Sequence, residues 1–410
     1  MQSSESYAPP APAVAVSRCA VVVLSLSAFA SGVSLRVTDA MLPRLAQEFN
    51  VSIGSAALVI TVFSVAYGLS QLFFGPMGDR FGKYLVISWA CVACSLTSLA
   101  CALAPGYGSL LVARTLAGAT AAAIIPLAMA WIGDVIAYEQ RQPVLARFLI
   151  GQIMGLSAGV MVGGYAAQHL DWRTPFFGVT VLFVAISVAL FAVNRQLPPQ
   201  ARLVRRVDGS AWKRMLSEFS QVLAVPWARV VLATVFLEGA FLYGAFAFIV
   251  SHLHLVYGMS LSSAGMVVML FGFGGLLFAL CVAGLVRALG EVGLSRWGGL
   301  LVAVAYLTIA FAPAWWLAIP ASFIAGLGFY MLHNTLQINA TQMAPDRRGA
   351  AVSAFASCFF MGQSVGVALC GLLLVRIGSS TTIACSAVGV LAVAWNFSRL
   401  RAARPNKTSA

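Results

Sequence analysis

Charged side chains are scarce in this chain, because aspartate, glutamate, lysine and arginine together make up 9% of its 410 residues. Only 12 residues are acidic and four are histidine. No His, Cys and acid cluster has metal-ligand spacing, and no nucleophile stands beside a base, which disfavours an enzyme or a metal site. The phosphate-binding loop of ATP-driven proteins is also missing. We therefore expect a protein that is not an enzyme and that holds no cofactor or metal.

Apolar residues make up 60% of the chain, and the mean hydropathy is +0.91. Apolar runs of about 18 or more residues are long enough to cross a bilayer as helices. Twelve such spans are predicted: Ala20–Pro43, Ser55–Phe74, Tyr84–Ala104, Leu110–Gly133, Ile150–Ala167, Phe176–Val193, Val230–Ser251, Ala264–Val286, Trp297–Ala312, Trp315–Ala340, Val352–Val375 and Thr381–Phe397. The expected fold is an all-α membrane protein whose surroundings are the lipid bilayer.

The net charge of +13 is distributed unevenly between the two sides of the predicted membrane. With the N-terminus inside, 20 of the 25 lysines and arginines fall on the inner side, whereas Arg44, Arg173 and Arg376 fall outside. This positive-inside asymmetry predicts that both termini are cytoplasmic. The basic surplus is thus explained by topology, and no nucleic-acid partner is expected.

The longest polar stretch, 194–228, separates six spans from six others. Its basic residues, with Trp212, Leu216 and Phe219, predict a short amphipathic helix along the membrane surface. The predicted parts are a disordered cytoplasmic tail at 1–17, an N-terminal six-helix bundle at 18–193, a basic cytoplasmic linker at 194–228, a C-terminal six-helix bundle at 229–400 and a cytoplasmic tail at 401–410.

Two pairs of motifs, each six spans apart, indicate that the two bundles are related by pseudo-symmetry. The stretch GLSAGVMVGG, Gly155–Gly164, is similar to GQSVGVALCG, Gly362–Gly371. The stretch GPMGDRFGK, Gly75–Lys83, is more weakly similar to GLVRALGEVG, Gly284–Gly293.

The first of the loop motifs, with Gly75, Asp79, Arg80 and Gly82, resembles the loop 2–3 signature of the major facilitator superfamily. Leu110-x-x-x-Arg114-x-x-Ala117-Gly118 resembles the span-4 signature of its proton-coupled members, and Gly155-x-x-x-Gly159-Val160-x-x-Gly163 resembles its antiporter signature, with Val160 at the usual proline. The resemblance is to twelve-span bacterial drug:proton antiporters and related efflux permeases. It implies a monomer in a bacterial inner membrane.

The resemblance also implies a gate. The acid at Asp79 would meet the start of span 11, beside Arg347 and Arg348, when the inner face is closed, and would leave it when that face opens. Gly75, Arg80 and Gly82 belong to the same loop. Gly155, Gly159 and Gly163 lie one helical turn apart, so that they serve either as a hinge or for close helix packing.

Arg36 and Asp39 are three residues apart within a predicted span, so they share a helical face and can pair. Charges at this depth are costly and usually border a cavity. In the superfamily, spans 1, 4, 7 and 10 line the central cavity. The polar side chains of the matching spans are Arg36, Asp39, Arg114, Glu238, Tyr330, His333, Asn334 and Gln337.

Glu238 has no basic neighbour along its own helix. If it stays desolvated, its neutral form is favoured, which suits a proton carrier; substrate contact and a structural role are the alternatives. Asp39 is the second candidate for proton coupling, or a structural partner of Arg36. Arg114 could act on a facing acid, hold an anion or be structural, and His333 could carry a proton or simply pack. Tyr243, Phe246 and other aromatic residues either line a pocket or fill the core.

These observations predict a secondary transporter of a small molecule, with protons as the coupling ion. The leading hypothesis is proton-coupled efflux of small amphipathic or cationic compounds. One alternative is a proton symporter that imports a small organic anion or a sugar through Arg36 and Arg114. The other is a transport-deficient membrane sensor whose basic linker engages a cytoplasmic partner.

Overall fold

The computed structural model describes residues 18–136, 138–202 and 211–404, all of which are helical or in short connections. The tail predicted at 1–17 and the end of the tail predicted at 401–410 lie outside these residues. The first half contains α1 Arg18–Arg36, η1 Asp39–Met41, α2 Leu42–Phe49, α3 Ile53–Ala56, α4 Leu58–Phe81, α5 Lys83–Ala102, α6 Tyr107–Ala121, α7 Ile124–Val135, α8 Tyr138–His169 and α9 Thr174–Gln196. No β-strand occurs among the described residues, which confirms the all-α prediction.

The second half follows a linker with η2 Pro199–Arg202 and α10 Ala211–Ala224. It contains α11 Pro226–Glu238, η3 Gly239–Tyr243, α12 Gly244–Tyr257, α13 Leu261–Phe311, η4 Trp315–Leu317, α14 Ala318–Gln342, η5 Pro345–Arg347, α15 Arg348–Ile377 and α16 Ser379–Ala402. The predicted linker helix therefore exists as α10, and Phe219 on it packs against the core. The side chains of Trp212 and Leu216 lie outside the described part.

Eleven helical stretches of the described chain are long and apolar enough to cross a membrane, and one of them, α13, has 51 residues. Gly290 interrupts α13 with φ 60° and ψ −178°, values that glycine adopts without strain. Phe278 before the break and Leu294 after it pack in one cluster with Met331, so α13 doubles back on itself. Counted as two helices, α13 brings the total to the predicted twelve spans.

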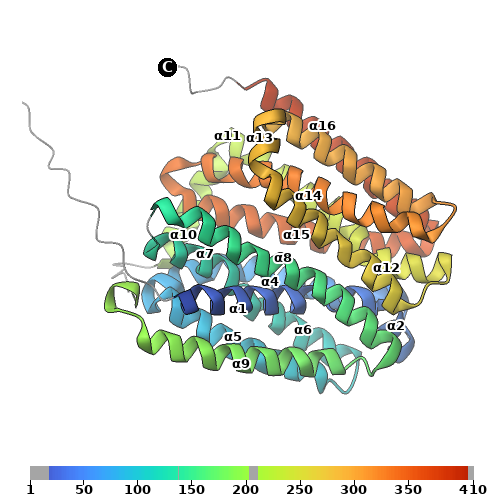
Figure 1. The fold of residues 1–410 in the computed structure, drawn as a ribbon, viewed down its shortest axis with the longest axis horizontal. Helices are drawn as coiled ribbons and strands as arrows, with labels where there is room; N and C mark the ends of the chain where they lie inside the picture. The colour runs from blue at the N-terminus through green and yellow to red at the C-terminus, as the bar shows by residue number, and fades with distance from the viewer. Residues whose placement is uncertain (1–17, 137, 203–210, 405–410) are drawn as a thin grey trace, which may run out of the picture.

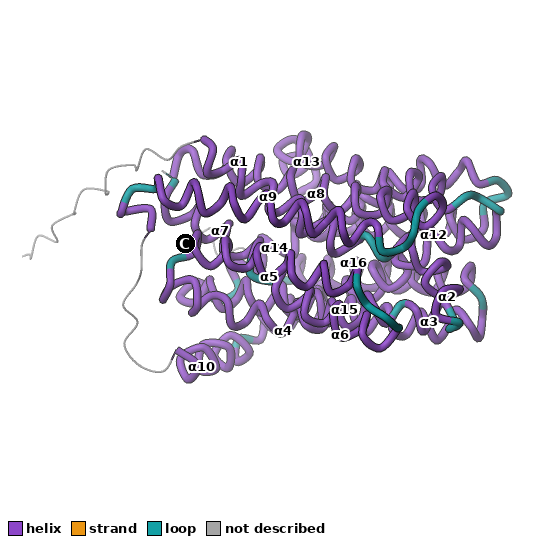
Figure 2. Tube along the Cα trace, turned by 90° about the horizontal axis from the view of Figure 1, so that it is seen from below, coloured by secondary structure: helices purple, strands orange, loops and turns teal. Residues whose placement is uncertain are grey.

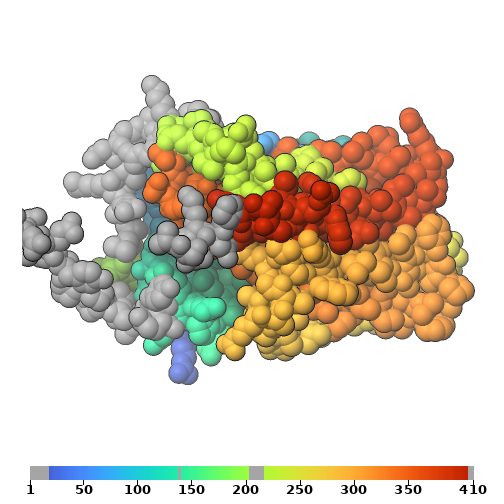
Figure 3. Space-filling view, turned by 90° about the horizontal axis from the view of Figure 1, so that it is seen from above, coloured from blue at the N-terminus to red at the C-terminus, as the bar shows by residue number. Residues whose placement is uncertain are grey.

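The spans run roughly side by side between two ends of the molecule, and both ends of the described chain lie at the same one (Figure 1). We call this end the terminal face and the other end, which holds Phe49–Ile53 and Gly258, the opposite face. Helix α10 lies at the terminal face, at the edge of the bundle in Figure 2, where it contacts α11 and α15. Figure 3 shows one of the sides between the faces, where α13 and α16 lie side by side. Large apolar side chains of these two helices are exposed, among them Leu280, Val388 and Trp395.

The two bundles repeat one packing arrangement, in which glycines of one helix press against the backbone of another. The contacts are Gly155 to Phe29 and Gly159 to Val33 between α8 and α1, and Gly362 to Phe236 and Gly366 to Ala240 between α15 and the α11–η3 segment. Each residue of the second set follows its counterpart in the first by 207 residues. The predicted repeat is thus real. Gly155, Gly159 and Gly163 are closely packed, because a Cβ at any of them would collide with the backbone of α1 or of Val37 directly after it.

This packing predicts the effect of a side chain at Gly155. Gly155→Val would place methyl groups where the Phe29 carbonyl lies, so we expect a loss of about 1–3 kcal/mol of stability or failure to fold. Thermal unfolding and gel filtration of the detergent-extracted protein measure this. The control is Gly178→Val on α9, where a Cβ meets nothing within 4 Å. Equal melting temperatures for the two variants would contradict the packing role.

Candidate functional site

The first membrane span is broken at its charged pair. Helix α1 ends at Arg36, and the chain continues through Val37 and Thr38 into the short 3-10 turn that starts at Asp39. The Nη1 of Arg36 lies 3.1 Å from Oδ2 of Asp39, and the two side chains are 2% and 1% exposed. The expected ion pair therefore forms, but across a helix break and not along one continuous helix.

Arg114 maintains this break. Its Nη1 donates to the Ser34 carbonyl at 2.9 Å, its Nε to the Val59 carbonyl at 3.2 Å and its Nη2 to the Thr38 hydroxyl at 3.5 Å. A helix end leaves carbonyls without partners, and the guanidinium of α6 satisfies one of them. Each guanidinium nitrogen of Arg114 donates one hydrogen bond, and Arg114 does not line the cavity described below. Among the roles that the sequence left open for Arg114, a structural role fits these contacts best.

Arg36 lies at the boundary between the two bundles. Its guanidinium carbon is 3.8 Å from the centre of the Tyr243 ring, and its Nη2 donates to Oε1 of Gln363 at 3.2 Å. Tyr243 and Gln363 both belong to the second bundle. Sequence reasoning missed Gln363, although it stands inside the repeated motif of span 11, where its counterpart at the offset of 207 residues is Leu156.

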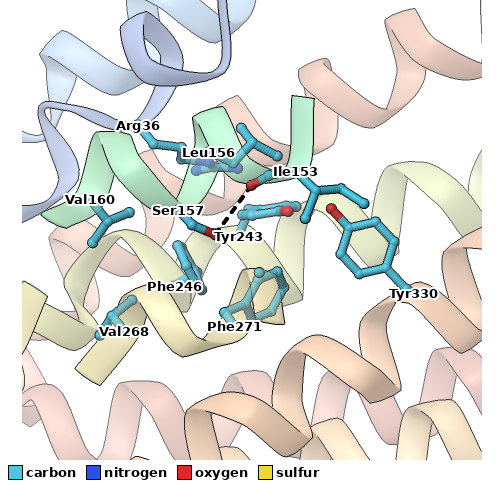
Figure 4. A pocket seen from close by; sticks show the side chains of 11 residues that line it. Arg36, Ile153, Leu156, Ser157, Val160, Tyr243, Phe246, Val268, Phe271 and Tyr330 are labelled. Atoms are coloured by element: carbon cyan, nitrogen blue, oxygen red, sulfur yellow. Dashed lines mark hydrogen bonds between the residues drawn. The ribbon is translucent and has the colours of Figure 1, made fainter. Parts of the chain in front are cut away.

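A small cavity adjoins this guanidinium. Figure 4 shows the rings of Tyr243, Phe246, Phe271 and Tyr330 around it. The remaining lining residues are Ile153, Leu156, Ser157, Val160, Val268 and Gly272. The walls thus come from spans 1, 5, 7, 8 and 10, whereas spans 1, 4, 7 and 10 were expected.

Two expected cavity residues, Asn334 and Gln337, are half-buried on α14 and do not border this cavity. Tyr330 of the same helix does border it. The aromatic residues Tyr243 and Phe246, whose role the sequence left open, are pocket residues.

Glu238 and His333 form a second polar centre, next to the cavity. Oε2 of Glu238 lies 2.9 Å from Nδ1 of His333, and the carboxyl group is 0% exposed while the imidazole is 18% exposed. Phe329, Phe355 and Phe359 surround the imidazole, with ring centroids 4.8–5.4 Å away. The sequence listed both residues but did not predict their contact, because they are 95 residues apart.

The backbone changes character directly after Glu238. The π-helical turn η3 starts at Gly239 and ends at Tyr243, and such turns occur often at functional sites. Span 7 is therefore irregular beside its buried acid, as span 1 is beside Asp39. In addition, Oε1 of Glu238 and Oδ1 of Asp39 are buried and have no hydrogen-bond partner among the described residues. A free carboxyl oxygen of this kind can hold a proton or meet a cationic ligand.

The loop between spans 2 and 3 forms its own charged cluster at the terminal face. Lys83 Nζ lies 2.8 Å from Oδ1 of Asp79 and 2.8 Å from Oδ2 of Asp134. The expected contact of Asp79 with Arg347 and Arg348 is not formed in this conformation. Gly82 turns the chain with φ 91°, and Arg80 lies over the Phe81 ring.

The two bundles are in close backbone contact near the opposite face, and no such contact forms at Gly75, near the terminal face. A Cβ at Gly164 would lie 2.6 Å from the Leu261 carbonyl oxygen, and Gly54 packs directly on Gly371. At the other end, a Cβ at Gly75 would meet nothing within 4 Å. The unformed contact of Asp79 agrees with this arrangement, because the resemblance predicts that contact only when the terminal face is closed.

Comparison with known proteins gives a family match across most of the chain. A family model described as the Major Facilitator Superfamily matches residues 24–367. The uncharacterized MFS-type transporter YceJ of Bacillus subtilis is 24% identical over 349 residues, which cover 84% of this chain and 86% of that protein. The efflux pump radE of Floropilus chiversii is 25% identical over 285 residues, which cover 64% of this chain and 53% of that pump.

The fold is also similar to that of solved structures. The crystal structure of a bacterial homolog to the human lysosomal transporter Spinster, in an inward-facing and unoccupied conformation, matches with a TM-score of 0.75. The two proteins are 16% identical, and the match covers 95% of this chain and 98% of that one.

The capping role of Arg114 predicts a stability defect. Arg114→Lys keeps the charge but cannot reach the Ser34 and Val59 carbonyls together, so we expect a loss of about 2–3 kcal/mol in the free energy of unfolding. Chemical unfolding in detergent measures it. Arg376→Lys, at an exposed arginine near the end of α15, is the matched control and should be neutral. If both variants unfold alike, Arg114 does not cap α1.

Proposed function

The chain belongs to the Major Facilitator Superfamily, and we propose that it is a secondary active transporter that exports small amphipathic or cationic compounds in exchange for protons by alternating access. The observation that carries this proposal is the Glu238–His333 pair. Glu238 is a buried acid with one unpaired oxygen, and Tyr243, whose ring lines the cavity, follows it at the end of the π-helical turn. Similarity to a named efflux pump supports the direction of transport.

The cavity favours a cation or a neutral aromatic compound over an anion. Four aromatic rings border it, and such faces attract cations. The guanidinium of Arg36 is already neutralised by Asp39, and Arg114 is engaged by backbone carbonyls. Neither arginine is free to hold a substrate anion, which argues against the alternative of an organic-anion importer.

The Glu238–His333 pair is suited to exchange a proton for a cation. A proton shared by the pair sits either on the imidazole, which then donates to the carboxylate, or on the carboxyl group, which then donates to neutral Nδ1. In both cases the net charge of the pair is zero, and the apolar phenylalanine rings around the imidazole favour this neutral state. Loss of the proton leaves one negative charge, which an arriving cation can compensate.

Alternating access then needs that proton to be taken up from one face and released at the other. In the present conformation the bundles pack closely near the opposite face, whereas Gly75, near the terminal face, has no contact with the second bundle at its Cβ position. We infer that the terminal face is cytoplasmic, in a bacterial inner membrane, because it carries most of the basic residues. The cavity would then be poised to collect a cytoplasmic substrate.

Glu238→Gln tests the coupling step. The amide mimics the protonated acid permanently, so we expect proton-driven export to fall to background while passive counterflow of substrate persists. The assay is uptake of a labelled lipophilic aromatic cation into inverted vesicles, with a pH-sensitive dye to follow protons. Glu238→Asp should retain partial activity with a shifted pH optimum.

Glu218→Gln on α10, outside the spans, is the matched control and should transport normally. Undiminished proton-coupled flux in Glu238→Gln would move the coupling site to Asp39. Flux of anions but not of cations by the unmodified protein would favour the importer, and no flux of either would favour the sensor.

The assignment of the terminal face is tested by reporter fusions. Fluorescent reporters fused after Ala201 and after Ala410 should both be active in the cytoplasm, because both positions follow an even number of spans. A secreted phosphatase fused after Asp171, between α8 and α9, should be active outside. A phosphatase signal from the C-terminal fusion would reverse the assignment.

A further inference from the structure

Gln363 connects the two bundles through the centre of the molecule. It lies on α15 of the second bundle and is 0% exposed, yet both ends of its amide contact the first bundle. Its Oε1 accepts from Arg36 Nη2 at 3.2 Å, and its Nε2 donates to the Ser64 hydroxyl at 2.8 Å. A buried amide with both ends satisfied fixes the position of its partners, since breaking either bond leaves a polar group without water.

Gln363 sits inside a seam of small residues between α3–α4 and α15, which lie side by side in Figure 2. Three pairs of residues meet along the seam, and successive pairs are seven residues apart on both helical segments. They are Ser357 with the Gly68 carbonyl, Ser364 with the Thr61 carbonyl, and Gly371 with Gly54. This seven-residue repeat is the spacing of two helices that stay in contact over several turns.

The seam is closed over only part of its length. Continuing the same register pairs Gly75 with Ala350, but a Cβ at Gly75 would meet nothing within 4 Å. The tight contacts thus extend from the opposite face to Gly68 and are absent at Gly75. Because Gln363 lies between Ser357 and Ser364, it belongs to the closed part, which must separate if the opposite face is ever to open.

We propose that Gln363 is a positioning residue of the transport cycle: it holds the Arg36 guanidinium against the Tyr243 ring while the opposite face is closed, and it releases that guanidinium when the seam opens. This inference rests on the proposed alternating-access function. Release separates Arg36 from Gln363 and from the Tyr243 and Phe246 rings of the second bundle. It leaves Arg36 with Asp39, which belongs to the same bundle. The hydrogen bond between Gln363 and Arg36 therefore favours the conformation that is open at the terminal face.

The pseudo-symmetry of the bundles provides the test variants. Leu156 occupies the equivalent position in the first bundle, one residue after Gly155 as Gln363 follows Gly362. Leucine therefore fits this position of the repeat, and Gln363→Leu removes both hydrogen bonds at similar volume. Gln363→Glu keeps the shape and replaces the Arg36 bond by a charge-assisted one, which is about twice as strong. The two variants should act in opposite directions.

The experiment measures distances by pulsed electron resonance on the full chain in lipid nanodiscs at pH 8, with the eight native cysteines replaced. One pair of spin labels, at Gln47 and Ile377, reports on the opposite face, and another, at Gln140 and Ala288, reports on the terminal face. We expect Gln363→Leu to raise the ratio of opposite-open to opposite-closed molecules at least about fivefold, the equivalent of one ordinary hydrogen bond. Gln363→Glu should lower that ratio.

Ser64→Ala offers a milder variant in case Gln363→Leu does not fold. It should shift the ratio in the same direction as Gln363→Leu, whereas Ser88→Ala, at a buried serine that bonds only within α5, should not shift it. Shifts of the same sign for Gln363→Leu and Gln363→Glu, or no shift in either, would overturn the proposal. The distances need no substrate or proton gradient, so a failure of proton coupling at Glu238 leaves this result interpretable.

Discussion

The guanidinium of Arg36 is buried halfway between two bundles, and the arrangement around it depends on satisfying that charge without water. A charged side chain at the centre of a bilayer costs about 2.5–3.5 kcal/mol on insertion scales, and more if it stays unpaired. Asp39 supplies the opposite charge, Tyr243 a ring face and Gln363 an acceptor. Two of these three partners come from the second bundle, so the charge is satisfied fully only when the bundles are together at this point.

The helix break after Arg36 has the same origin. A continuous helix would place all its carbonyls in internal bonds, and Asp39 would follow the helical path. In the broken helix, the buried guanidinium of Arg114 donates hydrogen bonds to the Ser34 carbonyl and to the Thr38 hydroxyl. Arg114 thus supports the segment that carries Arg36 and Asp39.

The two bundles share their packing but differ in their chemistry. The glycine contacts of α8 on α1 and of α15 on α11 and η3 repeat at a constant offset, and each bundle has an irregular segment beside a buried acid. In the first bundle the acid faces a permanent cation, Arg36. In the second it faces His333, which can lose its charge. The proposal that Glu238 carries the coupling proton rests on this difference.

The sequence by itself determined the membrane class, the twelve spans, the division into two bundles and the repeated motifs, because span length, charge asymmetry and glycine spacing are local properties of the chain. It also located the buried charged residues, since charges within apolar runs are rare. Only the tertiary structure decided which of them meet. The contacts of Glu238 with His333 and of Arg36 with Gln363 join residues 95 and 327 positions apart. The hydrogen bond of Arg114 to Ser34 depends on a helix break that no local sequence pattern predicted. Side-chain partners across helices depend on helix rotation and on where a helix breaks, and neither is encoded in the hydrophobic pattern of a single span.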